Sequence, residues 1–137
     1  WIKQKLIIAG KNPSKKITTA ASQHDTIQVI ANPTHDELQL LITQAHVNLL
    51  PTRQATGFKL KLMNALHNGR FCVVTSEMVK GTGLETACIV ATSADEICAI
   101  LEDLMRTPFS EEDIEKRKAL LEPFSNNASI AHLLQII

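Results

Sequence analysis

Five short apolar runs, rich in β-branched residues and leucine, alternate along this chain with segments in which apolar residues recur every three or four positions. The runs lie at residues 5–10, 26–31, 46–51, 71–76 and 88–93. Continuous apolar runs of this length are typical of strands buried on both faces of a parallel sheet. The alternation therefore predicts an α/β fold with a doubly wound, mostly parallel sheet and helices on both faces.

Helical segments lie between these runs and after the last one, and several have clear end signals. The segments cover residues 14–24, 34–45, 57–68, 94–107 and 110–122. Thr34 followed three residues later by Glu37 is a capping box, and Ser110 followed by three acids is a typical helix start. In such sheets ligands bind beyond the carboxyl ends of the strands. The candidate binding loops are therefore residues 10–16, 31–34, 52–57 and 76–84.

The segment 57–68 follows the third strand, so its first turn is expected at this carboxyl edge. Thr56 is the predicted N-cap and Gly69 the stop signal. The free amides of a helix start favour an anion, whereas Lys59 and Lys61 oppose the helix dipole there. Either both lysines are solvated surface residues, or an anion such as a diphosphate binds beside them. The residues expected to face the core are Phe58, Leu60, Leu62, Met63, Ala65 and Leu66.

Charge and length exclude several classes of function. The chain has 137 residues, and its 14 basic and 14 acidic residues cancel. A basic footprint for nucleic acid is therefore absent, and so is a polybasic patch for a membrane surface. The sequence has no apolar run of about 18 residues, no metal-ligand spacing and no hydrolytic triad. Because it opens on Trp1 without a secretory signal pattern, we expect a piece of a longer protein.

The three cysteines, Cys72, Cys88 and Cys98, have spacings that fit neither zinc nor redox motifs. Each lies among apolar neighbours, so each is expected to be a small buried hydrophobic residue. Unpaired cysteines are typical of a reducing compartment. The sequence therefore predicts a cytoplasmic protein.

The ordered series of segments resembles a known enzyme family. The run P-T-R-Q-A-T-G-F-K-L-K-L-M-N-A-L-H-N-G-R-F-C-V-V-T-S (51–76) is similar to the core of the C-terminal domain of type-B, family-4-like glycosyltransferases. The flanking runs KLIIAGKNP, IQVIANPTHDELQLLITQAHVNLLP and SEMVKGTGLET agree, so the resemblance covers about residues 5–125. It implies a Rossmann-like domain, the C-terminal half of a GT-B fold, that lacks its usual first strand.

The resemblance also implies an activity. Residues 1–137 would form a nucleotide-sugar-binding domain, with 110–137 as its closing C-terminal helices. The enzyme would transfer a hexose, such as mannose or glucose, from a UDP- or GDP-sugar to a glycan or lipid-linked acceptor. It would act in polysaccharide biosynthesis and need no cofactor or metal. The expected partner is the N-terminal acceptor-binding domain of the same protein, so the isolated fragment is expected to be inactive. Peripheral membrane association of the full-length protein stays open, and a catalytically inactive binding or scaffolding domain is the alternative.

Family members place two glutamates eight residues apart around this helix start, and the matching positions here are Thr56 and Asn64. Neither is an acid, although Asn64 can still form hydrogen bonds with a ribose diol. The residues expected to bind the donor are Thr56, Gly57, Phe58, Lys59, Leu60, Lys61 and Asn64, and no catalytic residue is assigned. Further candidates, each with a solvated surface role as the alternative, are Lys11 for a phosphate, His35 for the base, and Glu77 and Lys80 for the sugar.

Overall fold

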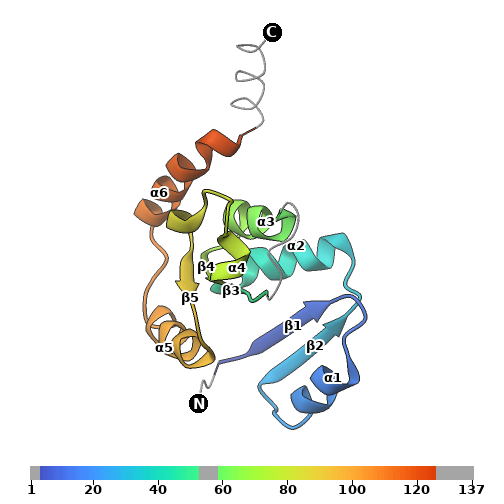
Figure 1. The fold of residues 1–137 in the computed structure, drawn as a ribbon. Coiled ribbons are helices and arrows are strands. Elements are labelled where there is room, and N and C mark those ends of the chain that lie inside the picture. The colour runs from blue at the N-terminus through green and yellow to red at the C-terminus, as the bar shows by residue number, and fades with distance from the viewer. Residues whose placement is uncertain (1–3, 53–58, 126–137) are drawn as a thin grey trace. The chain divides into compact units, whose positions relative to one another are not determined.

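A computed structural model describes residues 4–52 and 59–125 of the chain (Figure 1). Two compact units follow one another, Trp1–Leu41 and Ile42–Ile137. The elements are β1 (Leu6–Gly10), α1 (Lys15–Ala21), β2 (Ile27–Ala31), α2 (His35–Gln44), β3 (Val47–Leu50), α3 (Leu60–Asn68), β4 (Phe71–Thr75), α4 (Ser76–Val79), β5 (Ile89–Ala91), α5 (Ala94–Leu104) and α6 (Glu111–Leu121), with short 3-10 turns at Glu85–Ala87 and Glu122–Phe124. All five predicted strands are present, which confirms the α/β class.

The first unit contains a two-stranded parallel sheet in which β1 pairs with β2, Leu6 lying opposite Ile27. Ser14 caps α1, the short helix that the sequence indicates after the first strand. The predicted capping box of α2 is confirmed. The N–H of Thr34 donates to Oε2 of Glu37 at 2.7 Å, and the N–H of Glu37 donates to Oγ1 of Thr34 at 3.2 Å.

The second unit contains a three-stranded parallel sheet with β4 in the centre, in the order β3-β4-β5. Both sheets are parallel, and helices lie beside their strands along the chain. This arrangement is consistent with the predicted Rossmann-like half-domain.

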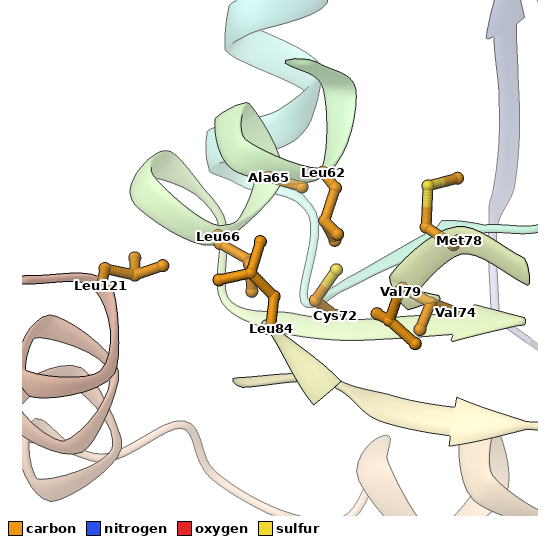
Figure 2. Packing of buried hydrophobic residues seen from close by; sticks show 9 residues of the cluster. All are labelled: Leu62, Ala65, Leu66, Cys72, Val74, Met78, Val79, Leu84 and Leu121. Carbon is orange, nitrogen blue, oxygen red and sulfur yellow. The ribbon is translucent and has the colours of Figure 1, made fainter. Parts of the chain in front are cut away.

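Helices cover both faces of the three-stranded sheet. On one face Cys72 and Val74 of β4 pack against α3, α4 and α6 (Figure 2). This cluster consists of Leu62, Ala65, Leu66, Cys72, Val74, Met78, Val79, Leu84 and Leu121. On the other face Val73 and Ala91 pack against α5 through Leu104. Successive residues of β4 thus point to opposite, equally buried faces, as expected for a central parallel strand.

Burial on both faces, which the sequence indicates for several of the strands, is seen in β4. Val73 and Val74 of β4 are fully buried, whereas Leu6 and Ile7 of β1 are 42% and 38% exposed. A two-stranded sheet has no central strand and offers little surface for packing.

The cysteine prediction holds for Cys72 and not for Cys98. Cys72 is buried under α3, and its hydrogen bond with the half-buried Cys88, together with burial, raises the pKa of the Cys72 thiol. Cys98 is exposed on α5. Its apolar sequence neighbours Ile97 and Ile100 face the sheet, and position 98 lies outside that stripe.

One arginine joins α6 to the end of α3. The guanidinium of Arg117 donates to the carbonyl oxygens of Leu66 at 3.4 Å and Gly69 at 2.9 Å, and also to that of Arg70. A helix leaves the carbonyls of its last turn without intrahelical partners, and its carboxyl end attracts a cation. Arg117 therefore acts as a C-terminal cap of α3, supplied by a helix far along the chain.

A row of aromatic rings in edge-to-face contact continues from this arginine along the amino edge of the sheet. The guanidinium of Arg117 lies 4.8 Å from the centre of the Phe109 ring, and Phe109 packs edge-to-face on Phe71 with ring centres 5.0 Å apart. Phe71 packs in the same way on His46 at 5.3 Å. Nε2 of His46 lies 2.8 Å from the carbonyl oxygen of Leu104, to which it donates. The row thereby ties α5 and α6 to the starts of β3 and β4.

Gly69 ends α3 at a point where no side chain fits. A Cβ there would lie 2.3 Å from Nδ2 of Asn48 and 2.7 Å from the carbonyl oxygen of Ala65. Asn48 is a buried residue of β3, and its amide donates to the carbonyl oxygen of Ile42 at 3.2 Å. Since the φ of Gly69 is −93°, close packing and not a left-handed backbone requires the glycine.

Replacement of Arg117 by methionine keeps most of the side-chain stem and removes the guanidinium. We expect the Arg117→Met variant to lose about 2 kcal/mol in free energy of unfolding, since several carbonyls lose a charged donor. Urea denaturation measures this loss. The matched control is Lys116→Met. Lys116 forms an exposed ion pair with Glu112, and such pairs contribute little, so this substitution should leave the urea midpoint unchanged. Equal effects of the two substitutions would contradict the capping role.

The Gly69→Ala substitution should destabilise the protein by about 2–3 kcal/mol, since Asn48 or the end of α3 must move to admit a methyl group. Gly10→Ala is the control, because a Cβ at Gly10 meets no atom within 4 Å. Thermal and chemical unfolding of both variants should separate them clearly. A tolerated Gly69→Ala would show that the contact with Asn48 relaxes freely.

Candidate functional site

The candidate site of the second unit lies where its parallel strands end. β3, β4 and β5 point the same way, so the starts of α3, α4 and α5 gather at one edge of the sheet. Six predicted residues lie on the described part of α3 and on the segment after β4: Lys59, Leu60, Lys61, Asn64, Glu77 and Lys80. Three more, Thr56, Gly57 and Phe58, lie outside the described residues.

α3 begins at Leu60, three residues later than predicted. Lys59 has φ −89° and ψ 60°, which is not helical, and its carbonyl oxygen accepts the N–H groups of Leu62 and Met63 at 2.9 and 3.0 Å. The predicted cap, Thr56, lies outside the described residues. Leu60 is 73% exposed, so its predicted place in the core is wrong. The buried stripe of α3 begins two residues later, at Leu62.

The start of α3 differs chemically from the starts of the other long helices that the structure describes. α2, α5 and α6 each have acids in the first turn and a side-chain cap, from Thr34, Ser93 and Ser110 respectively. The described turns of α3 have no acid at the start and no side-chain cap, and Lys61 is exposed at the second position. Free amides and a basic side chain both favour an anion here.

The start of α5 is already satisfied by its own carboxylate. Oε2 of Glu96 accepts the N–H and the hydroxyl of Thr92, both at 2.7 Å, and Oγ of Ser93 accepts the N–H of Glu96 at 3.1 Å. The hydrogen bonds from Thr92 hold the pKa of Glu96 below its usual range. A bound anion is therefore disfavoured at the start of α5.

Asn64 lies in the second turn of α3 and is half-buried. The amide of Asn68 donates to Oδ1 of Asn64 at 2.7 Å and to its carbonyl oxygen at 3.2 Å, which places the two side chains on one face as predicted. Oδ1 is thus partly used, while the NH₂ group of Asn64 brings two donors. Towards a diol, Asn64 is best suited to donate hydrogen bonds.

The segment 76–84, predicted as a loop, is anchored in the core. It begins with α4, and Met78, Val79 and Leu84 belong to the cluster on the α3 side of the sheet. Glu77 is half-buried and Lys80 is exposed. Both glycines of the K-G-T-G turn have a φ of 72°, a backbone conformation that favours glycine. This packing fixes the backbone of the segment that carries Glu77 and Lys80.

In the first unit, Lys11 and His35 lie at the carboxyl edge of the β1-β2 pair, and both are exposed. The two loops are cross-linked, because the N–H of Asn12 donates to Oδ1 of Asn32 at 2.9 Å and the N–H of Asn32 donates to the carbonyl oxygen of Gly10 at 2.8 Å. Both asparagines have a positive φ, 48° and 53°. The sequence analysis missed this link, whose signal is the Asn-Pro pair present in both loops.

The side chains of the described residues form no group of three or more His, Cys, Asp or Glu that would hold a metal ion. None of the described helices is long and apolar enough to cross a bilayer.

A family model, glycosyl transferases group 1, matches residues 2–107. The chain belongs to this family. The match confirms the resemblance to type-B glycosyltransferases seen in the sequence. A relative from Klebsiella pneumoniae, named "Uncharacterized 44.6 kDa protein in cps region", is 34% identical over 98 residues. These cover 68% of this chain and 25% of the relative, so the chain spans about a quarter of the relative's length. No solved structure shows a significant match.

The Glu96→Gln substitution in this glycosyltransferase domain should change how its stability depends on pH. The folded pKa of Glu96 lies below the unfolded value, so the carboxylate stabilises the fold above the unfolded pKa, and this contribution is lost as pH falls through the folded pKa. Wild type should therefore be more stable than Glu96→Gln at pH 7, and the difference should shrink below about pH 4. Urea unfolding at several pH values measures it. A difference independent of pH would contradict the role of the charge.

Proposed function

We propose that this chain is the donor-binding part of a larger glycosyltransferase that transfers a hexose from a nucleoside diphosphate sugar to a glycan or lipid-linked acceptor. The family match over residues 2–107 carries the proposal. The chain spans only a quarter of its relative, which is consistent with an additional acceptor-binding domain. The relative's name places it in a cps region, and this supports a role in polysaccharide biosynthesis.

The start of α3 is the proposed diphosphate site. The amides of Leu60 and Lys61 and the ammonium groups of Lys59 and Lys61 supply positive charge, and Gly57 is a further candidate from the sequence. When the bond from the sugar to the diphosphate breaks, negative charge grows on the leaving group. Helix amides and lysines held at this edge stabilise that charge without a metal ion.

The other candidates have subordinate places in this proposal. Asn64 would donate to the ribose hydroxyls, and Glu77 and Lys80 would contact the sugar. Lys11 and His35 belong to the other unit, and no contact with this site is assigned to them. Residues 1–137 would act as one nucleotide-sugar domain closed by 110–137, in a cytoplasmic enzyme whose isolated C-terminal part is inactive.

A binding or scaffolding domain without catalysis is the second candidate function. The position of Asn64 favours it, because a neutral amide replaces the acid that family members place there, and the described part of α3 begins without any acid. A neutral hydrogen bond to a ribose diol is weaker than a charge-assisted one. Such a domain would bind the nucleotide and transfer no sugar.

Titration of the full-length protein with UDP and with GDP, by calorimetry, tests donor binding. We expect one of the two nucleotides to bind saturably and Lys61→Ala to raise its Kd about tenfold, as loss of a charged contact predicts. The control is Lys118→Ala on α6. The ammonium of Lys118 pairs with the exposed carboxylate of Glu115, and its loss should leave the Kd unchanged.

Two other outcomes decide between the hypotheses. No saturable binding of either nucleotide, or equal affinities of the Lys61→Ala and Lys118→Ala variants, would refute the diphosphate site. Binding without transfer or hydrolysis of the matching nucleotide sugar, in the presence of membrane and glycan extracts, would favour the binding domain over the enzyme.

A further inference from the structure

Two cysteines lie side by side across the β4-β5 pair of the second unit. The two strands are parallel, and their pairing begins with Val73 opposite Ile89. Cys72 and Cys88 come one residue before these partners. The backbone of Cys88 is extended, with φ −125° and ψ 162°, so it continues the line of β5 towards its start. The register of the sheet therefore places Cys88 opposite Cys72.

The two side chains also point to the same face of the sheet. Cys72 belongs to the buried cluster on the α3 side (Figure 2), and Cys88 packs against that cluster. The two thiols share a hydrogen bond. Neighbouring strands lie about 4.8 Å apart. A disulfide joins residues whose Cα atoms lie about 4.4–6.8 Å apart. The strand spacing at this pair therefore suits a disulfide.

The two thiols differ in access and in electrostatic surroundings. Cys72 is 2% exposed, whereas Cys88 is half-buried. The hydrogen bond from the Cys72 thiol lowers the pKa of Cys88, and the guanidinium charge of Arg117 acts in the same direction. Burial and the carboxylate of Glu85 oppose these effects. Reactive cysteines are partly exposed and lie near a positive charge. Cys88 is therefore the thiol that an oxidant meets first, and Cys72 lies behind it.

We propose that Cys72 and Cys88 form a reversible disulfide when a peroxide reaches Cys88. The Cys88 thiolate attacks one oxygen of hydrogen peroxide and becomes a sulfenic acid, and the hydroxide that leaves takes up the proton released by the thiol. The sulfur of Cys72 then attacks the sulfenic sulfur, and the hydroxyl group leaves as water with the Cys72 proton. The two sulfurs together lose two electrons, which the two peroxide oxygens gain.

The disulfide would close a loop around residues 73–87. This loop contains α4 and the K-G-T-G turn, and it carries Glu77 and Lys80. A cross-link of this kind stabilises the folded protein by restricting the unfolded chain. The redox chemistry needs no nucleotide, so it is independent of the proposed function.

Peptide mapping of the full-length protein tests for the disulfide. The reduced protein is treated with hydrogen peroxide, quenched with catalase, alkylated with iodoacetamide in urea, and cleaved after basic residues and glutamate without reduction. Cleavage after Lys80 and after Glu96 puts the three cysteines on separate peptides. We expect the peptides of Cys72 and Cys88 to be joined, two hydrogens lighter than the sum of the thiol forms. Dithiothreitol should release them.

Single substitutions distinguish the roles of the two thiols. Cys72→Ala leaves Cys88 without a partner, so oxidation should stop at a sulfenic acid that dimedone labels. Cys88→Ala should leave the buried Cys72 reduced under the same conditions. Cys98→Ala is the control, because Cys98 is exposed on α5 and its loss should not change the yield of the disulfide.

Thermal unfolding gives a second readout on the same samples. Oxidised wild type and oxidised Cys98→Ala should both melt about 5 °C or more above their reduced forms. Recovery of Cys72 and Cys88 as alkylated thiols, at a peroxide concentration that oxidises the exposed Cys98, overturns the proposal. A disulfide that joins either of them to Cys98 instead overturns it as well.

Discussion

The burial of β4 between two layers of helices is the constraint on which the second unit depends. Leu62 and Leu66 of α3 pack on one face of this strand (Figure 2). Leu104 of α5 packs on the other face. Burial of apolar side chains such as these is the main favourable contribution to the folding free energy of a small domain. Because α3 and α5 both pack against the same strand, their starts are held at its carboxyl edge. Packing therefore determines which helix starts lie at that edge.

The strands and most helix starts were predictable because their signals are local. Apolar runs mark the strands, and the pairs Thr34 with Glu37 and Ser110 with Asp113 mark helix starts through bonds between near neighbours. The start of α3 was not, because the apolar pattern continues through Leu60 although the backbone turns helical only after Lys59. The stop at Gly69 was predicted, whereas its long-range hydrogen bond with Arg117 leaves no pattern in the sequence.

The start of α3 is the candidate site because it differs from the other described helix starts, and not because it carries a sequence motif. The start of α5 is closed by its own Glu96, whereas the described start of α3 has no acid and no side-chain cap and carries the exposed Lys61. The resemblance to the family points to α3 and shows two neutral positions, Thr56 and Asn64, where acids are usual. It could not show that Asn64 is already engaged by Asn68, since that bond depends on the rotamers of both amides.

The cap that Arg117 places on α3 has a consequence for the order of folding. The bond from Arg117 to Gly69 spans 48 residues, and it reaches the end of α3 from α6. Until α6 has been synthesised, this partner does not exist, and water must satisfy the last carbonyls of α3. Contacts that join residues this far apart in the sequence slow folding. The end of α3 is therefore completed by one of the last contacts that the chain can form.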